Sequence, residues 1–298
     1  MIDLHTHTTA SDGRCTPAEL VTRAAAAGVT ILSVTDHDTV AGCGDAAEAC
    51  AAAGIEFVAG IEVTAVRERA DVHVLGYFID TRSAALHDFL SEQRRRRVDR
   101  VREMIHRLAA AGIHLDADAV VQPAIDNPAR SAGRPWIARA LVAGGFVRDS
   151  NEAFGRWLAR GRPAYVPRAA ASPDEVFERI HDAGGVASLA HPGLNDRDEW
   201  IESFAAGRAD SATGRARSAW GLDALEAYHT EHDEAATARY LEMAKRLGLA
   251  VTGGSDYHAD HAHGAAGPGS VSLPREAFDD LRRRATRRAT ASGDGTSS

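Results

Sequence analysis

Seven short apolar runs, each long enough for one β-strand, recur along this chain and constrain its fold more than any other feature. They span residues 2–5, 30–35, 55–60, 72–78, 186–190, 222–228 and 249–253. Alanine-rich helical segments separate the early runs; one covers residues 17–27, with Thr16 as its predicted N-cap and Gly28 as its stop. Strands and helices that alternate in this way predict βα units around a parallel sheet.

The stretch from residue 81 to residue 170 has a different pattern. A long helical periodicity covers residues 86–111, a turn rich in proline and asparagine follows, and two shorter helical segments cover residues 136–143 and 152–159. We therefore predict a helical insertion at 81–170, which divides the sheet-forming part into residues 1–80 and 171–285. The loop at 205–218 is predicted to be flexible, and the polar tail at 286–298 to be disordered.

Composition excludes several classes of protein. A formal net charge of −8 opposes binding to duplex DNA, which relies on a basic surface. No apolar run approaches the ~20 residues that a membrane span needs. Three cysteines are too few for a disulfide framework and indicate a reducing compartment. We expect a cytoplasmic protein without membrane contact, and nothing in the composition indicates its oligomeric state.

Potential metal ligands stand at or near the ends of almost every apolar run. The motifs are His-x-His at 5–7 with Asp12 beyond it, TDHD at 35–38, GIE at 60–62, AHP at 190–192 and GSDYH at 254–258. The fourth run carries His73 near its start, and His229 and His232 follow the sixth. One histidine at a strand end is commonly a satisfied polar residue. In a parallel barrel, however, the carboxyl ends of all strands meet at one mouth, so the repetition predicts a metal centre there.

The His-x-His spacing alone is not specific. A second such pair, at residues 261 and 263, lies in a stretch rich in glycine and alanine with no predicted strand before it. We expect that pair to lie in a surface loop.

Taken in order, the motifs HTH, TDHD, GIE, AHP and GSDYH resemble those of the PHP (polymerase and histidinol phosphatase) superfamily over residues 2 to about 272. GRPWIARALV at 133–142 and GRPAYV at 161–166 resemble insertion motifs of bacterial PHP phosphoesterases that act on 3′,5′-bisphosphate nucleotides and on the 5′ ends of short RNA. The resemblance implies an α/β fold, a distorted seven-stranded (β/α)7 barrel with an inserted helical cap.

The resemblance also implies a site for two to three divalent ions. One set would be His5, His7, Glu62 and Asp256; a second would share Glu62 and add His73 and His191; a third would be Asp12, His37 and His258. Mn²⁺ is the first expectation, with Fe²⁺ or Zn²⁺ as alternatives, because imidazole and carboxylate ligands suit all three. Bridging metals lower the pKa of a bound water, so hydroxide is the expected nucleophile. Asp256 is expected to be a catalytic residue because it would hold one of these metals.

Four further residues are candidates for substrate contacts. Arg134 and Arg162 match positions that bind substrate phosphate in the family, and a guanidinium meets phosphate oxygens in pairs. His232 matches a family histidine; it either holds phosphate or protonates the leaving oxygen, or else has a supporting role. His229 matches no family position and is expected to have only a supporting or surface role. Trp136 replaces the usual family histidine and either stacks on a base or packs within the insertion.

The run of four arginines at 94–97 invites a nucleic-acid interpretation. On a helix, however, four consecutive side chains point around the whole axis, and Glu92, Asp99 and Glu103 are spaced to pair with them. We expect a solvated helix surface.

We expect a phosphoric ester hydrolase that removes the 3′-phosphate of small nucleoside 3′,5′-bisphosphates and leaves a nucleoside 5′-monophosphate. Three alternatives stay open. They are a 5′→3′ exoribonuclease on short RNA, a phosphatase for another phosphomonoester such as histidinol phosphate, and a non-catalytic metal-stabilised binding module.

Overall fold

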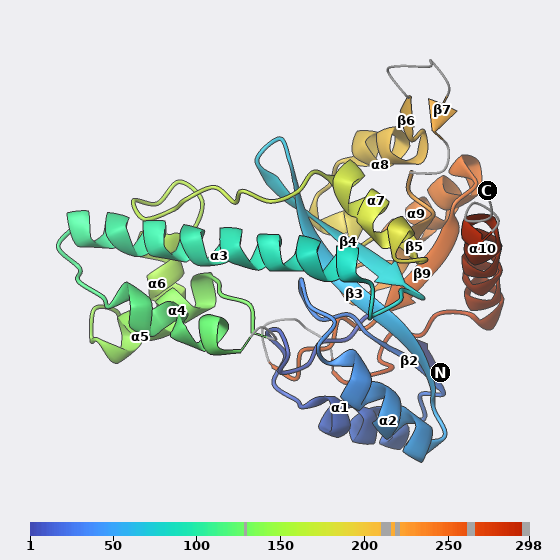
Figure 1. The fold of residues 1–298 in the computed structure, drawn as a ribbon, viewed down its shortest axis with the longest axis horizontal. Coiled ribbons are helices and arrows are strands. Elements are labelled where there is room, and N and C mark those ends of the chain that lie inside the picture. Colours follow the sequence, from blue (N-terminus) through green and yellow to red (C-terminus); the bar gives the residue numbers. More distant parts are fainter. Residues whose placement is uncertain (128–129, 210–215, 218–220, 261–265, 294–298) are drawn as a thin grey trace.

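A computed structural model describes residues 1–127, 130–209, 216–217, 221–260 and 266–293 (Figure 1). Its main sheet has seven strands in the order β1–β2–β3–β4–β5–β8–β9. The strands are β1 (Ile2–Asp3), β2 (Ile31–Val34), β3 (Glu56–Arg67), β4 (Ala70–Tyr77), β5 (Val186–Leu189), β8 (Ala224–His229) and β9 (Ala250–Gly254). Each of the seven predicted runs therefore supplies one strand, and the α/β fold is confirmed.

The first and last strands approach each other and nearly close the sheet into a barrel. The Leu4 amide donates to the Gly253 carbonyl over 3.2 Å, and the Asp256 amide donates to the His5 carbonyl over 2.8 Å. Gly254 permits this approach, because a Cβ there would lie 2.3 Å from the His5 amide nitrogen. The closure brings the chain after β9 beside the chain after β1.

The sheet is mixed, so the prediction of βα units around a parallel sheet is wrong for β4. That strand pairs antiparallel with both β3 and β5, whereas the other pairings are parallel. β3 runs on to Arg67 and turns back through Glu68 and Arg69, whose φ values of 52° and 66° fit a two-residue hairpin. Because β4 runs in the opposite direction, the early part of β4, where His73 lies, is at the same barrel end as the carboxyl ends of the parallel strands.

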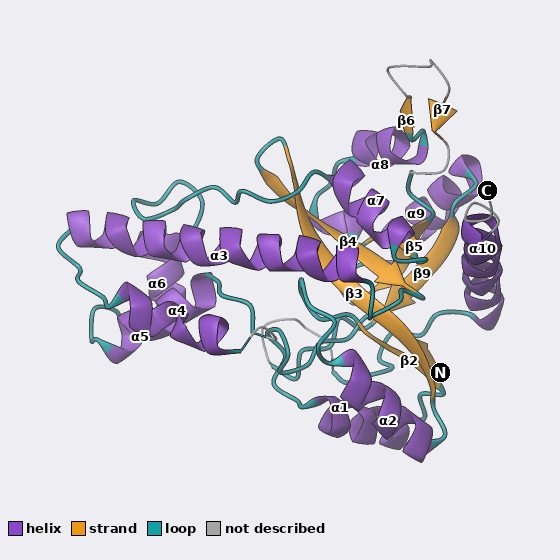
Figure 2. Cartoon of the chain, viewed as in Figure 1, coloured by secondary structure: helices purple, strands orange, loops and turns teal. Residues whose placement is uncertain are grey.

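Helices cover the outside of the barrel (Figure 2). They are α1 (Pro17–Ala26), α2 (Cys43–Ala53), α7 (Pro173–Asp182), α8 (Asp198–Ala205), α9 (Glu234–Leu247) and α10 (Arg275–Gly293). The predicted start of α1 is confirmed, since the Thr16 side chain caps the helix and Glu19 reaches back to the Thr16 amide. α10 continues to Gly293. The prediction that the chain is disordered from residue 286 onward is therefore wrong for residues 286–293, which are helical.

The predicted helical insertion is present and has a core of its own. It contains α3 (Ala84–Ala110), α4 (Ala117–Asp126), α5 (Arg134–Ala143), α6 (Ser150–Ala153) and a π-helical turn (Phe154–Leu158). The first part of α3 packs on the barrel through Phe89 and Leu90, and the remainder projects outward and carries α4–α6 (Figure 1). Met104 and Leu108 of that outer part belong to a separate apolar cluster inside the insertion.

Two predictions fall partly or wholly outside the described residues. The loop at 205–218 contains the short antiparallel strands β6 (Arg208–Ala209) and β7 (Ala216–Arg217), but residues 210–215 and 218 lie outside the description. The histidines at 261 and 263 also lie outside it. In the part of the chain that the structure describes, no helix is both long and apolar enough to span a membrane.

We predict that Gly254→Ala lowers the free energy of unfolding by about 1–3 kcal/mol, because the added methyl group forces β9 away from β1. Gly44→Ala in α2 is the matched control, since a Cβ at Gly44 meets no atom within 4 Å. Urea denaturation measures both variants. Equal stability of the two variants would contradict the closure described for β1 and β9.

Candidate metal centre

The nine residues predicted as metal ligands meet at one end of the barrel. They come from the chain after β1 (His5, His7, Asp12), after β2 (His37), from β3 and β4 (Glu62, His73), after β5 (His191) and after β9 (Asp256, His258). Most are buried; the Asp12 side chain is 47% exposed and faces the surface. His73 lies near the start of its run, whereas the sequence predicts ligands at the carboxyl ends of strands. The antiparallel direction of β4 explains why His73 nevertheless lies with the other ligands.

Glu62 lies at the middle of the cluster and is only 1% exposed. Its Oε1 lies 2.9 Å from His73 Nδ1 and 3.1 Å from His191 Nε2. Its Oε2 lies 3.0–3.5 Å from one ring nitrogen each of His5, His7 and His37. One carboxylate therefore bridges two groups of imidazoles, as a ligand shared by two metal ions would do.

Two imidazoles of the first predicted ligand set lie beside the same two carboxylates. The Nε2 atoms of His5 and His7 each lie 3.2–3.5 Å from Glu62 Oε2 and from Asp256 Oδ1. Four ligands placed ~2.1 Å from one ion in a tetrahedron would be separated by about 3.4 Å. The four separations are of this size, whereas the candidate ligand groups of the described residues place His5 with His229 and Asp256 and also with Glu62 and His191.

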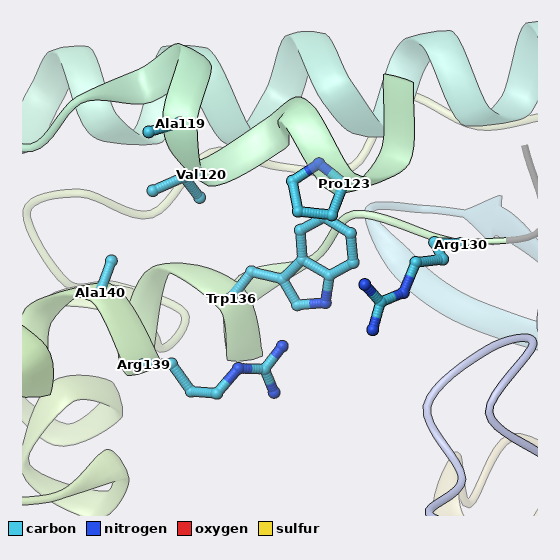
Figure 3. A pocket seen from close by; sticks show the side chains of 7 residues that line it. All are labelled: Ala119, Val120, Pro123, Arg130, Trp136, Arg139 and Ala140. Atoms are coloured by element: carbon cyan, nitrogen blue, oxygen red, sulfur yellow. The ribbon is translucent and has the colours of Figure 1, made fainter. Parts of the chain in front are cut away.

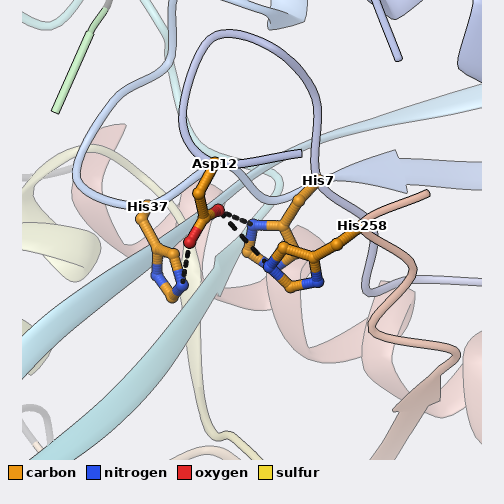
Figure 4. A group of neighbouring side chains, drawn as sticks. All are labelled: His7, Asp12, His37 and His258. Carbon is orange, nitrogen blue, oxygen red and sulfur yellow. Dashed lines mark ion pairs between the residues drawn. The ribbon is translucent and has the colours of Figure 1, made fainter. Parts of the chain in front are cut away.

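The third predicted set forms a neighbouring group at the barrel mouth (Figure 4). Asp12 Oδ1 lies 3.3 Å from His258 Nε2 and 3.8 Å from His7 Nδ1, and Asp12 Oδ2 lies 3.7 Å from His37 Nε2. His7 thus faces this group through Nδ1 and the first set through Nε2. The structure adds His7 to the three residues that were predicted here.

Several buried ring nitrogens in the cluster make no hydrogen bond with any described residue. They include His5 Nε2, both nitrogens of His7, His37 Nδ1, His191 Nδ1 and His229 Nε2. An unsatisfied buried polar group costs about 1–3 kcal/mol, so an array of them beside carboxylates is costly in the absence of a partner. The residues present therefore fit divalent cations, and the imidazole and carboxylate donors suit Mn²⁺, Fe²⁺ or Zn²⁺.

Electrostatics in the cluster keep its carboxylates ionised. Burial acts to raise the pKa of Asp256, but His5, His229 and His7 outweigh burial and hold that pKa well below its usual value. Burial acts to lower the pKa of His7, but Asp256 and Glu62 raise it to about 10. Carboxylates are thus ready to bind a cation, and a metal ion has to displace protons from the imidazoles.

Two residues of the cluster have unusual backbone conformations. His191 has φ of 26° and Asp256 has φ of 53°. A side chain with a Cβ rarely adopts positive φ, and such conformations concentrate at functional sites where the surroundings enforce them. The hydrogen bond from the Asp256 amide to the His5 carbonyl is one such restraint.

His229 lies beside the predicted ligands and is buried, so the expectation of a surface histidine is wrong, whereas a supporting role stays a prediction. It is 4% exposed, its Nε2 lies 3.5 Å from Asp256 Oδ2, and it forms a candidate ligand group with His5 and Asp256. His229 is the last residue of β8. Its position just after the sixth run places it among the potential ligands, and only the comparison with the family motifs argues against it.

His232 has both ring nitrogens engaged. Its Nδ1 lies 3.0 Å from the Ala227 carbonyl oxygen, to which it donates, and its Nε2 accepts from the Gly193 amide over 3.1 Å. Burial lowers the pKa of His232, which keeps the ring neutral. These bonds favour the supporting role that the sequence left open, since His232 fixes the loop that follows His191.

The remaining substrate candidates lie on the insertion. Trp136 is half-buried and lines a cavity of about 540 Å³ that also reaches Asp12 and His37. The Arg134 guanidinium lies 5.6 Å from the centre of the Phe154 ring. Arg162 is exposed in the loop after the π-helical turn.

One arginine of the 94–97 run departs from the predicted solvated surface. Arg95 and Arg96 pair with Glu92 as expected. The Arg97 side chain is only 13% exposed, forms an ion pair with Asp38 and lines the 540 Å³ cavity. Helical periodicity could not show this, because it gives the direction of a side chain but not the neighbour that it meets.

Comparison with known proteins agrees with this geometry. Residues 3–139 match the PHP domain family. The chain is 36% identical to the 3′,5′-nucleoside bisphosphate phosphatase of Chromobacterium violaceum over 87% of both chains, and 34% identical to the 5′-3′ exoribonuclease Rnm of Salmonella typhimurium over 86% of this chain and 84% of that one.

A solved structure described as an amidohydrolase from Chromobacterium violaceum, with bound sulfate, superposes with a TM-score of 0.76. It is 34% identical, and the match covers 95% of this chain and 96% of that one. The matched motifs, the barrel and these similarities show that the chain belongs to the PHP domain family.

Proposed function

We propose that this protein is a metal-dependent phosphoesterase that removes the 3′-phosphate of nucleoside 3′,5′-bisphosphates and leaves nucleoside 5′-monophosphates. The observation that carries the proposal is the cluster of histidines and carboxylates at the mouth of the barrel, which opens into a cavity shared with the insertion. The name of the relative from Chromobacterium violaceum supports the same choice of substrate.

In this proposal the nine predicted ligands hold two to three divalent ions, with Mn²⁺ as the first candidate. When bound, such ions lower the pKa of a water for attack on phosphorus and neutralise the charge on the phosphate oxygens. Asp12 is the most exposed of the nine, so its group lies nearest to an arriving substrate. Asp256 and Glu62 stay anionic and supply the negative charge that holds the ions.

Arginines of the insertion are the proposed phosphate contacts. Arg97 lines the cavity, and its guanidinium is oriented by Asp38 and by a 3.0 Å hydrogen bond to Thr64 Oγ1. Arg134 and Arg162 are also proposed to bind substrate phosphate, because both match phosphate-binding positions in the family motifs. Two phosphates on one substrate call for cationic contacts in addition to the metal ions.

Glu226 is proposed to orient the ligands although it lies inside β8. It is fully buried; its Oε1 accepts from His5 Nδ1 over 3.0 Å, and its Oε2 accepts from the His191 amide over 2.7 Å. A carboxylate bonded to one ring nitrogen turns the other toward the metal and raises its basicity. Asp36 has a comparable effect on the Asp12 loop, because it accepts 2.7 Å hydrogen bonds from the Thr8 amide and from Ser11 Oγ.

The second candidate is a 5′→3′ exoribonuclease on short RNA. The observation that favours it is the extension of the cavity past Trp136, Arg130 and Arg139 on the insertion. The Salmonella typhimurium relative carries that activity in its name. The net charge of −8 favours a small substrate, because a long RNA would need a broad basic surface.

The proposed function predicts fast, metal-dependent phosphate release from adenosine 3′,5′-bisphosphate. With Mn²⁺-loaded enzyme, we expect kcat/KM at least tenfold higher than for short 5′-phosphorylated RNA or histidinol phosphate. Asp256→Ala is the inactive control, because it removes a proposed ligand. A reversed substrate order would contradict the choice of substrate, and no release from any of the three would support a non-catalytic binding module.

For Glu226→Gln we predict a loss of metal affinity of about 10- to 100-fold, since His5 loses the carboxylate that orients it. The matched control is Glu234→Gln on the exposed start of α9, which should bind metal as the wild type does. Titration calorimetry with Mn²⁺ measures both variants. Unchanged affinity in a folded Glu226→Gln protein would contradict an orienting role.

A further inference from the structure

A groove continues from the metal cluster across the face of the insertion. It consists of two adjoining cavities of about 540 and 290 Å³, which share Arg130, Trp136 and Arg139. The larger cavity reaches Asp12 and His37 at one end. The smaller cavity lies between α4 and α5, on the far side of the shared residues from the cluster (Figure 3).

The groove contains three arginines that form no ion pair with a described residue, although Asp12 and Asp260 also line the larger cavity. These arginines, Arg14, Arg130 and Arg139, are exposed, and all three line the larger cavity. Burial has the larger effect in lowering the pKa of Arg139, and the charges of Arg130 and Arg14 also act to lower it. Guanidinium groups without an ion-pair partner favour the binding of an anion, and their geometry suits phosphate in particular.

Trp136 supplies an aromatic surface at the same place. It is half-buried, packs against the apolar cluster of the insertion and lines both cavities. Figure 3 shows its indole near Pro123 of α4, with the Arg130 and Arg139 side chains reaching toward the same space. An aromatic ring beside arginines is a common combination for a nucleobase and its phosphate, because the base stacks on the ring and the guanidinium groups pair with the phosphate.

We propose that Trp136, Arg130 and Arg139 form a nucleotide subsite, in which a nucleobase stacks on the indole and a phosphate pairs with the arginines. Trp136 is then a specificity-determining residue that favours substrates with a base over simple sugar phosphates. The inference rests on the proposed function, because the phosphate to be removed enters the same groove at its Asp12 end.

The test compares adenosine 5′-monophosphate, which has a base, with ribose 5-phosphate, which has none. Calorimetry with the Mn²⁺-loaded 298-residue chain should give at least tenfold tighter binding of the nucleotide. Trp136→Leu should abolish that advantage and leave ribose 5-phosphate binding unchanged. Trp136→Phe should retain most of the advantage because it keeps an aromatic face, and Arg139→Gln should weaken both ligands by a similar factor.

Trp157→Leu is the matched control, since Trp157 is a similarly half-buried tryptophan of the insertion that lines neither cavity. Thermal unfolding confirms that each variant is folded. Equal affinity of the wild type for the two ligands, or equal weakening of nucleotide binding in the Trp136 and Trp157 variants, would overturn the subsite. If binding depends on Trp136 but adenosine 3′,5′-bisphosphate is not hydrolysed, the subsite is supported and the proposed function fails.

Discussion

The burial of the Glu62 carboxylate among imidazoles is the interaction on which the rest of this structure depends. A carboxylate that is 1% exposed is costly unless cationic groups surround it. Burial acts to raise the pKa of Glu62, but His37, His73 and His5 outweigh burial and hold that pKa well below its usual value. The charge therefore persists inside the barrel. Divalent ions fit the same arrangement, because they would satisfy both the carboxylate and the buried ring nitrogens that make no hydrogen bond within the described ranges.

The barrel geometry brings these side chains to Glu62. Parallel strands deliver their carboxyl ends to one mouth, and the reversal of β4 delivers His73 to it from an early position in that strand. The close approach of β9 to β1 at Gly254 places Asp256 beside His5. The insertion then covers one side of the mouth, so that the cavity has metal ligands at one end and arginines with Trp136 at the other.

Much of this arrangement could be predicted from the sequence because strand ends and ligand residues coincide. The seven runs predicted the strands, and the motif order predicted which histidines and carboxylates lie together. The direction of β4 could not be predicted, because an apolar run does not indicate whether its strand pairs parallel or antiparallel with its neighbours. Glu226 was missed because a carboxylate inside an apolar strand looks like an outward-facing residue; its partner, His5, is far away in sequence. Arg97 was missed because its partner, Asp38, lies on the barrel rather than on its own helix.

The most direct test of the central claim is the number of metal ions that each chain holds. Elemental analysis after Mn²⁺ loading and desalting should find two to three ions in the wild type. Glu62→Ala should lose at least two of them, because Glu62 contacts imidazoles of more than one ligand set. Asp12→Asn should lose at most one, because Asp12 contacts only the group at the mouth. If a folded Glu62→Ala protein kept the full wild-type complement of ions, a metal centre organised around that carboxylate would be contradicted.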